Sequence, residues 1–427
     1  MLAVRRAVSQ TVSGLPQEFW WLWTSTLTNR IGGFVVPFLA LYLTVDRGFS
    51  AAYAGLVAAL YGLGGIVGAL LGGVLSDRIG RRKTMLVTQA GAATATATLG
   101  FVTAPVPISA LVCVVGVTTN AARPVVQAMM ADLVPAEDQG RAFSLNYWAT
   151  NFGMSVSTAL AGLMATHGYL ALFLTNALMT LLCGMVVFIK IPETRPSMPD
   201  GDAAVTPAEA IVLSRVLRDG RFMALVGSTF LIATLVQQSS NTLAVSMGNS
   251  GLTASQYGLV AGLNGLLIVL LQIPITRLTR SCDRAWLLLV SSLLVGGGFG
   301  LTIFAESAWS YAVTVTVWTL GEVVMLPASV ALVADFSPTH ARGRYQGMYA
   351  LAWSAASFVG PLAGGVALDR WGNGMWPFCA VIGAVAGAGY WALLRTRSTG
   401  LSAKQVDTAH LQRHSSGDVT ARTTPKE

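Results

Sequence analysis

Twelve long apolar runs, spaced almost evenly along the chain, constrain the fold more than any other feature of this sequence. Each run is close to the ~20 residues that a helix needs to cross the hydrocarbon core of a bilayer. Only helices and closed barrels satisfy the backbone in lipid, and continuous apolar runs favour helices over the alternating pattern of barrel strands. The sequence therefore predicts an all-α membrane protein with twelve transmembrane helices at about 17–44, 53–75, 84–103, 107–131, 142–165, 169–191, 222–247, 255–276, 285–305, 308–334, 345–368 and 374–394.

Charged residues are scarce and unevenly placed. They make up 11% of the chain, whereas a soluble domain usually has about 25%. If the runs cross a membrane, 23 of the 27 Lys and Arg residues fall on one side, and only Arg47 and Arg370 fall on the other. The positive-inside rule then places both termini in the cytoplasm. The formal charge of +8 is thus a topology signal, and we expect no nucleic-acid partner.

The chain divides into two similar halves. PVVQAMMADLVPAEDQGR (124–141) aligns without gaps on PASVALVADFSPTHARGR (327–344). Parallel repeats with a central site at their interface are typical of transporters. We therefore expect two pseudo-symmetric six-helix bundles. The predicted regions are an N-terminal bundle at 1–191, a cytoplasmic central loop at 192–220, a C-terminal bundle at 221–395 and a disordered cytoplasmic tail at 396–427.

The segment GGVLSDRIGRRKTML (72–86) resembles the signature loop of the Major Facilitator Superfamily (MFS). NRIGGFVVPFLALYL (29–43), ADLVPAEDQGR (131–141) and GEVVMLP (321–327) look most like bacterial twelve-helix drug:proton antiporters. This resemblance implies the MFS fold and a multi-pass protein of a bacterial inner membrane.

The resemblance also implies a conformational latch. In the family, the acid and the second arginine of the loop, here Asp77 and Arg81, form a charge network with an acid at the end of the fourth helix, here Asp132. The second-half loop, 275–288, lacks the Asp-Arg-x-Gly core, and we expect a weaker latch there. The alternative is that the basic residues only fix topology and bind anionic membrane lipids. The latch residues are Gly73, Asp77, Arg78, Gly80, Arg81 and Asp132.

Glu322 is the one acid of 19 that falls deep inside a predicted span. A charge at mid-bilayer costs at least ~2.5–3.5 kcal/mol, and a carboxyl group avoids that cost by binding a proton. Glu322 is therefore the best candidate for proton or cation coupling. Trp318 and Met325 lie one helical turn away on the same face, where an aromatic ring suits an organic cation. The alternative for Trp318 is a packing role.

Two basic residues, Arg30 and Arg123, also fall inside spans, and we assign them to coupling with Glu322. In the antiporters that this chain resembles, an arginine in the fourth helix governs protonation, and several exporters have an arginine at the position of Arg30. The alternative is an interior ion pair with Glu322 or a clamp on backbone carbonyls. For Gln237, Gln238 and Asn241 of the seventh span, the alternative to a substrate cavity is hydrogen bonding between helices. That cavity contains Asn120, Gln127, Gln237, Gln238, Asn241, Asn264, Trp318, Met325 and Trp353.

These features predict a secondary active transporter that works as a monomer. The leading hypothesis is a proton-coupled exporter of drugs or other small lipophilic or cationic molecules, driven by the proton gradient without a cofactor. The alternative is proton-coupled or facilitative uptake of a small nutrient such as a sugar, an amino acid or a peptide. The four histidines fall in loops or the tail, no metal-ligand spacing is present, and no GxxxxGK[ST] loop occurs. We therefore expect neither an enzyme nor an ATP-driven pump.

Overall fold

The computed structural model describes residues 14–135, 137–193, 216–279, 281–337 and 342–395. Within these ranges the regular secondary structure is helical, and each predicted span coincides with one helix or with consecutive short helices. The first half contains α2 (Gln17–Ile31), α3 (Val35–Leu41), the π-helix η1 (Tyr42–Asp46), α4 (Ala51–Ile79), α5 (Arg81–Leu99), α6 (Pro105–Leu133), α7 (Gln139–Ala165) and α8 (Tyr169–Lys190). The predicted tail 396–427 and most of the predicted loop 192–220 lie outside the described residues.

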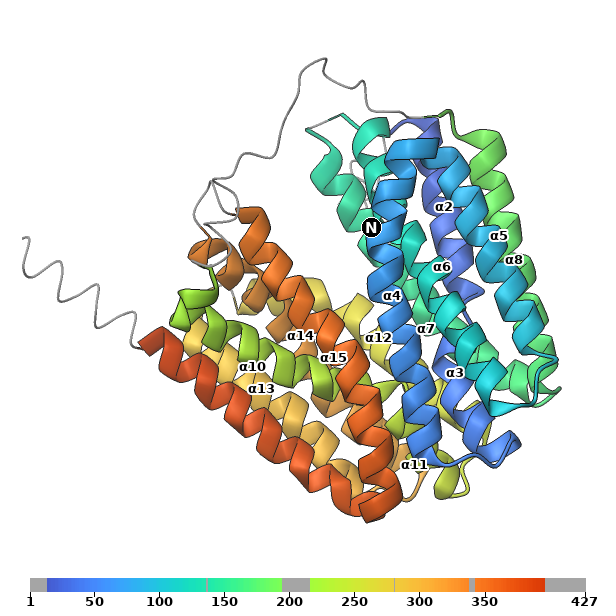
Figure 1. The fold of residues 1–427 in the computed structure, drawn as a ribbon. Helices are drawn as coiled ribbons and strands as arrows, with labels where there is room; N and C mark the ends of the chain where they lie inside the picture. Colours follow the sequence, from blue (N-terminus) through green and yellow to red (C-terminus); the bar gives the residue numbers. More distant parts are fainter. Residues whose placement is uncertain (1–13, 136, 194–215, 280, 338–341, 396–427) are drawn as a thin grey trace, which may run out of the picture.

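The second half repeats this order. It contains α10 (Gly220–Val236), η2 (Gln237–Ser239), α11 (Thr242–Asn249), α12 (Ala254–Leu278), α13 (Arg284–Gly300), η3 (Leu301–Phe304), α14 (Ala308–Phe336), α15 (Arg342–Trp371), η5 (Gly372–Met375) and a helix at 376–395. Figure 1 shows the two halves as separate helix bundles, with α4 and α15 adjacent where they meet.

Nine stretches of the described chain are long and apolar enough to cross a membrane. The predicted spans α5 and α7 are not among them, because α5 begins with three basic residues and both helices contain many Thr, Ser, Asn or Gln residues. The stretch at 345–395 counts once although it holds two helices. At 1.5 Å per residue its 51 residues would reach about 77 Å, against ~30 Å of hydrocarbon. The chain turns at Gly372, whose φ of +53° favours glycine, and the last helix runs back along the bundle (Figure 1).

Several helices begin at a side-chain cap, which satisfies backbone N–H groups at the helix start. The Ser50 side chain accepts from the Tyr53 N–H at the start of α4, and Thr253 forms a capping box with Gln256 at the start of α12. Ser50 and Thr253 occupy equivalent positions, 203 residues apart, in the two halves. The repeat found in the sequence therefore extends to the helix starts.

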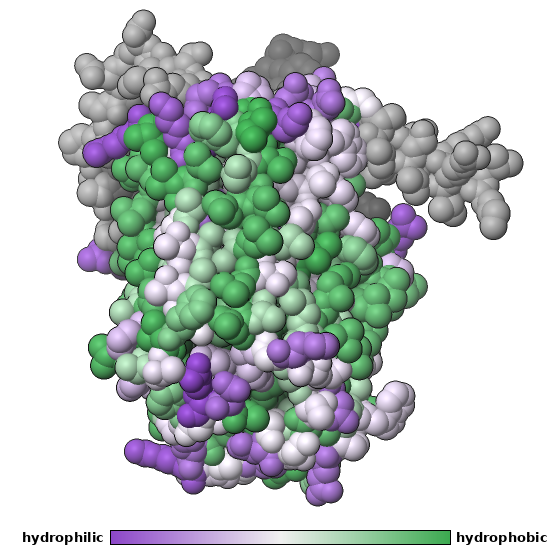
Figure 2. Space-filling model, turned by 90° about the vertical axis from the view of Figure 1, so that its right-hand side faces the viewer, coloured by the Kyte–Doolittle hydropathy of each residue, from purple (hydrophilic) through white to green (hydrophobic). Residues whose placement is uncertain are grey.

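The outer surface of the first half is apolar between two polar ends. Figure 2 shows an apolar belt across this face, with hydrophilic residues gathered above and below it. Large apolar side chains on α4, α5 and α8 are exposed there, among them Leu70, Val87 and Ile189. On a water-soluble protein such a belt would promote aggregation, but in a bilayer it is the surface that lipid covers.

Helix α4 has glycines on two opposite faces, and each face packs on a different neighbour. A Cβ atom at Gly64, Gly68 or Gly72 would collide with the backbone of α6, in the same half. A Cβ at Gly55 or Gly62 would collide with the backbone of α15, in the other half. Gly62 and Gly64 differ by about 200° around the helix. One face of α4 is therefore fixed inside its bundle and the other forms the seam between the halves.

The seam lies toward one end of the molecule. Its contacts involve the first part of α4, the last part of α7, the first part of α12 and the pair α3 and α11. The Tyr257 hydroxyl donates to the Pro37 carbonyl oxygen at 3.0 Å, and Ser155 Oγ donates to the Gly262 carbonyl oxygen at 2.6 Å. The segment 72–86 lies at the other end of α4, which we call the signature end. The bundles diverge toward that end (Figure 1).

A carboxylate closes the seam at the end opposite the signature end. Asp369, near the end of α15, accepts hydrogen bonds from the backbone N–H groups of Ala51 at 2.9 Å and Ala52 at 2.7 Å. These N–H groups begin α4, where the helix dipole is positive, so the negative charge is favourable there. Asp369 therefore joins the two halves through a helix terminus.

Candidate functional site

Glu322 lies on α14 and is the one buried acid among the residues that the structure describes, with 8% of its surface exposed. Asn264 on α12 donates from Nδ2 to Glu322 Oε2 at 3.0 Å, and the same nitrogen is 3.0 Å from Thr319 Oγ1. A buried carboxyl group needs such partners, since water does not reach it freely. The structure therefore brings together two predicted residues, Glu322 and Asn264.

Tyr147 on α7 connects this arrangement to the first half. It interacts electrostatically with Glu322 although it belongs to the other half, and the Asn151 side chain donates to its carbonyl oxygen at 2.9 Å. Nearly half of the Tyr147 surface, 48%, is exposed. Sequence reasoning missed Tyr147, because nothing in the sequence around this tyrosine indicates that it faces the acid of the second half. Glu322 thus lies where the two halves face each other.

Arg30 and Arg123 lie on two helices of the first half that contact each other. Arg30, on α2, interacts electrostatically with Arg123 on α6 and with Tyr61 on α4. Gly153 of α7 packs against the Arg30 Cβ, where any larger residue would collide. Within the described residues, neither arginine forms an ion pair with an acid. The ion pair with Glu322, which was the alternative for these arginines, is therefore not present in this conformation.

The polar neighbours of Arg123 differ from each other. Asn120 is buried, donates to the Gly116 carbonyl oxygen at 2.9 Å and packs against Gly65. Gln127, one turn beyond Arg123, is exposed, as is Arg123 itself. The face that carries Arg123 and Gln127 is therefore open, whereas Asn120 bonds to its own helix.

Trp318 and Met325, which were predicted to face a bound cation beside Glu322, lie in the apolar core. Trp318 is 2% exposed and stacks on Phe299 of α13 with ring centroids 5.0 Å apart, and Met325 is 1% exposed. Both belong to the main core cluster of the protein. Trp353 on α15 is partly buried against the same core. In this conformation Trp318 packs rather than lines an open surface, which agrees with the alternative given for it above.

The seventh predicted span is broken where its polar residues occur. α10 ends at Val236, and α11 begins at Thr242 after a short 3-10 helix. Gln238 is buried and donates to the carbonyl oxygens of Thr234 at 2.9 Å and Gly360 at 3.0 Å. The second hydrogen bond joins this segment to α15, which agrees with the alternative of hydrogen bonding between helices. Gln237 packs against Gly360 as well. Asn241 is buried, and neither its Oδ1 nor its Nδ2 has a partner among the described residues.

The signature end contains the charge network that the resemblance implies. Arg81 is ion-paired with Asp132, donates to the Ala128 carbonyl oxygen at 2.9 Å and interacts electrostatically with Asp77. Gly80 adopts a φ of +92°, which allows the tight turn between α4 and α5. Gly73 has open space around it.

Two features at this end were not predicted. Glu193 accepts from the Arg82 N–H at 3.2 Å and lies against Gly80, so it caps the start of α5. Arg284 is ion-paired with Asp335, and each partner lies 203 residues after its counterpart in the pair of Arg81 and Asp132. The second half therefore keeps the ion pair although its loop lacks the signature core. The Arg284 pair is the more exposed one, which agrees with a weaker contact there.

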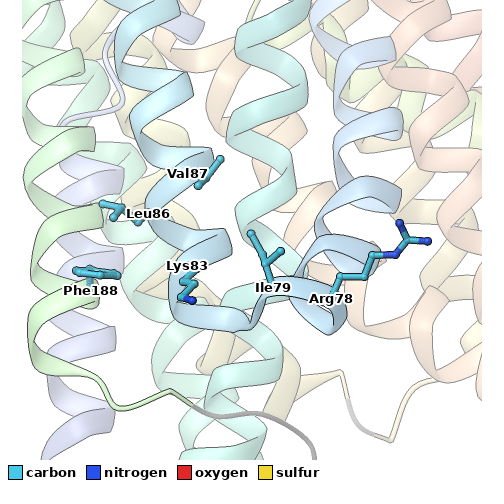
Figure 3. Close-up of a pocket in the computed structure, with 6 residues that line it drawn as sticks. All are labelled: Arg78, Ile79, Lys83, Leu86, Val87 and Phe188. Carbon is cyan, nitrogen blue, oxygen red and sulfur yellow. The ribbon is translucent and has the colours of Figure 1, made fainter.

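A hollow lies beside these charges at the signature end of the first half. Lys83, Leu86 and Val87 of α5 and Phe188 of α8 line it, together with Arg78 and Ile79. Figure 3 shows Phe188 facing α5, while the Arg78 guanidinium extends away from the other residues that line the hollow. The hollow lies within the first half and not at the seam, and its mixture of cations and apolar walls suits the alternative in which these residues contact lipid head groups.

Comparison with known proteins places this geometry in context. The sequence model of the Major Facilitator Superfamily matches residues 22–250 and 226–419. The Na(+), Li(+), K(+)/H(+) antiporter of Planococcus maritimus is 23% identical over 405 residues, which cover 85% of this chain and 94% of the antiporter. The class C tetracycline resistance protein of Escherichia coli is 27% identical over 353 residues, which cover 80% and 87% of the two chains.

A solved structure shows a similar fold. The nucleoside transporter NupG superposes with a TM-score of 0.74 at 13% identity, covering 89% of this chain and 99% of that one. At this identity the likeness concerns the fold alone.

Proposed function

The chain belongs to the Major Facilitator Superfamily, and from this premise we propose that it is a proton-coupled antiporter that exports small lipophilic or cationic organic molecules. It is a secondary transporter and a multi-pass protein of a bacterial plasma membrane, not an enzyme. The observation that carries the proposal is Glu322, a buried carboxyl group that contacts Asn264 and faces the other half through Tyr147.

The proposed topology has twelve crossings with both termini in the cytoplasm. The distribution of Lys and Arg supports this orientation, since 23 of 27 lie in the termini and in the loops on the side of the signature end. In this orientation the seam lies toward the outside, and the bundles diverge toward the cytoplasm (Figure 1). The conformation described here is then the inward-open state of an alternating-access cycle.

The proposed cycle uses Glu322 as the coupling group. A substrate enters between the halves from the cytoplasm and displaces the proton of Glu322. Rocking of the halves exposes the site to the outside, where Glu322 takes up a proton and the substrate leaves. The protonated carrier then returns. A membrane potential supplies ~2.3 kcal/mol per charge per 100 mV, so exchange of protons for substrate can drive export.

The relatives support export. Two of them are an antiporter that exchanges cations for protons and a tetracycline resistance protein. We propose that this chain shares their use of the proton gradient, works as a monomer and needs no cofactor. The nature of its substrate is a separate question.

The test is substrate-induced proton movement in proteoliposomes with a panel of lipophilic cations and antibiotics. We expect proton release with the wild type and none with Glu322→Gln. Asn264→Leu removes the hydrogen bond to the carboxylate and should slow exchange roughly tenfold or more, since hydrogen bonds to charged groups contribute ~1.5–3 kcal/mol. Glu306→Gln changes an exposed acid at the opposite end and serves as the matched control.

Two outcomes would contradict the proposal. Full activity of Glu322→Gln would make Glu322 a structural residue, and the coupling group would have to be another. Proton movement in the same direction as the substrate would instead support the uptake of a nutrient. Circular dichroism and thermal unfolding of each variant separate a loss of coupling from a loss of fold.

A further inference from the structure

The hollow at the signature end of the first half has a volume of about 530 Å³, which is within the range of small-molecule sites. Its walls come from the end of α4, the start of α5 and the facing part of α8 (Figure 3). Both α5 and α8 lie on the side of the first half that faces away from the second half (Figure 1). Val87, 56% exposed, lines the hollow and belongs to the apolar surface of the protein. The hollow therefore opens toward the lipid that covers this surface and not toward the space between the halves.

The chemistry of the hollow changes along α5 in the order found in a phospholipid. Lys83 lies near the start of the helix, at the polar end of the molecule, and Leu86 and Val87 follow three and four residues later. At 1.5 Å of rise per residue, the apolar wall begins about 5 Å deeper in the membrane than the cation. A phosphate group at the depth of Lys83 would thus place an acyl chain against Leu86 and Val87.

The acids at this end leave two cations beside the hollow without a partner. Three acids act on Arg81, one through an ion pair and two electrostatically: Asp132, Asp77 and Glu193. The bond of Glu193 to Arg82 uses the backbone N–H of Arg82. Within the residues that the structure describes, neither Arg82 nor Lys83 forms an ion pair. Both charges are therefore available to an anion.

Arg82 is held in a position to bind a phosphate group. Its guanidinium carbon lies 4.2 Å from the centroid of the Phe188 ring, and Phe188 lines the hollow. Its Nε atom is buried and has no hydrogen-bond partner among the described residues. A guanidinium group that rests on an aromatic face keeps its N–H donors at its edges, where they can form paired hydrogen bonds with two phosphate oxygens. Arg82 and Lys83 are adjacent at the start of α5, so one phosphate group is within reach of both long side chains.

We propose that the hollow binds one anionic phospholipid from the membrane leaflet at the signature end. Its phosphate contacts Arg82 and Lys83. One acyl chain lies on the apolar wall that Phe188 and α5 form. A soluble phosphate would satisfy the cations but leave this wall bare, so the geometry favours a lipid. In the proposed topology this leaflet faces the cytoplasm, where anionic lipids attract basic residues. The site is separate from the Arg81 ion pair and from Glu322, so it does not depend on the proposed function.

The second half provides an internal comparison. At the offset of 203 residues, the positions of Arg82, Lys83 and Phe188 hold Ala285, Trp286 and Trp391. Arg395 stacks on Trp391 with its guanidinium carbon 4.7 Å from the ring centroid, but it comes from the same helix, one turn further along. The adjacent pair of cations is thus confined to the first half, and we expect no equivalent lipid site in the second.

The experiment measures lipid binding to the purified, delipidated full chain by native mass spectrometry in detergent. The probes are phosphatidylglycerol and phosphatidylcholine with the same acyl chains, and glycerophosphoglycerol, which is the phosphatidylglycerol head group without its chains. We expect one phosphatidylglycerol to bind roughly tenfold or more tightly than phosphatidylcholine, because two cations contact its uncompensated negative charge. Glycerophosphoglycerol should bind far more weakly than the intact lipid, since it lacks the groups that cover the apolar wall.

Variants assign the preference to the hollow. Arg82→Gln and Lys83→Gln should each weaken phosphatidylglycerol binding about fivefold, which corresponds to the attraction of one basic residue for an anionic lipid surface. Binding of phosphatidylcholine should change little. Arg395→Gln is the matched control, because it removes a cation that stacks on an aromatic ring at the same end of the other half. Lys83 is exposed, so Lys83→Gln tests the site even if Arg82→Gln does not fold.

Three results would overturn the proposal. Equal affinity for the two lipids would reduce the hollow to ordinary lipid contact. A loss in Arg395→Gln as large as that in Arg82→Gln would show attraction to the whole charged surface. Binding of glycerophosphoglycerol as tight as that of the lipid would indicate a site for a soluble phosphate. None of these results bears on proton movement in Glu322→Gln, so this proposal and the proposed function can fail separately.

Discussion

At the scale of single residues, the contrast between Arg81 and Arg284 separates a buried ion pair from an exposed one. Both pairs occupy equivalent positions in the two halves. Arg81 is 8% exposed and also donates to the Ala128 carbonyl oxygen, whereas the Arg284 side chain is 51% exposed. The two arginines therefore have different expected roles in stability, although the sequence repeat treats them alike.

We predict that Arg81→Gln lowers the free energy of unfolding by about 1–3 kcal/mol, because it leaves buried polar groups without partners. Arg284→Gln should cost less than about 1 kcal/mol, since exposed ion pairs contribute little. Thermal unfolding in detergent, followed by tryptophan fluorescence, measures both. Equal losses of Tm in the two variants would contradict the distinction.

At the scale of elements, α4 is the helix on which the two kinds of packing can be compared. Gly68 approaches the α6 backbone inside the first half, and Gly62 approaches the α15 backbone across the seam. The same substitution at these two positions should have different consequences. One contact must persist through a transport cycle, and the other must open.

We predict that Gly62→Ala keeps the protein folded but shifts it toward the state in which the signature end is closed. An added methyl group prevents close contact at the seam and leaves the bundle intact. Gly68→Ala should instead lower the Tm. Distances between spin labels at Lys83→Cys and Trp286→Cys, in a Cys282→Ser background, report the shift. An unchanged distance distribution in Gly62→Ala would count against the seam as a moving contact.

Loss of the Asp369 charge should also favour opening of the seam. We predict that Asp369→Asn weakens the cap on α4. The population that is open at the end opposite the signature end should rise roughly two- to fivefold, as expected for ~0.3–1 kcal/mol at a helix N-terminus. Asp46→Asn, which changes an exposed acid at the same end, is the control. The same pair of spin labels measures both variants, and an equal response from both would remove the special role of Asp369.

At the scale of the whole molecule, the conformation implies that the space beside Glu322 can be reached from one side of the membrane only. We predict that Tyr147→Cys reacts with a membrane-impermeant maleimide in inside-out vesicles and not in intact cells, because the space beside Glu322 opens at the signature end. Val45→Cys, 59% exposed at the opposite end, should react in intact cells. Labelling of Tyr147→Cys in resting intact cells would show that the halves open outward.

The helices could be predicted from the sequence almost completely. Apolar runs of this length leave the backbone no other way to satisfy its hydrogen bonds in lipid, so each predicted span is helical in the structure. The breaks in the first and seventh spans were less predictable. Gly32 and Gly33 interrupt α2 and α3, and Gln237–Ser239 interrupts α10 and α11, where tertiary contacts override continuous helical patterns.

The site could be predicted only in part. Glu322 was predictable because a charge in an apolar run is conspicuous, and Asn264 because a polar residue in a span needs a partner. Tyr147 and Asp369 could not be assigned their partners, since both contacts cross between halves that are far apart in sequence. The turn that carries Trp318 and Met325 was predictable, but periodicity alone does not say which neighbour a helix face meets.

The glycines of α4 at the seam also affect how fast the two halves can separate. At Gly55 and Gly62 the meeting surfaces are backbone against backbone, so few side chains interlock there. These two surfaces can part with little rearrangement of side chains, whereas Tyr257, Ser155 and Asp369 release hydrogen bonds elsewhere along the seam. Separation at the glycines therefore need not limit turnover, and we expect the slower steps at the groups that exchange hydrogen bonds, protons or ligands.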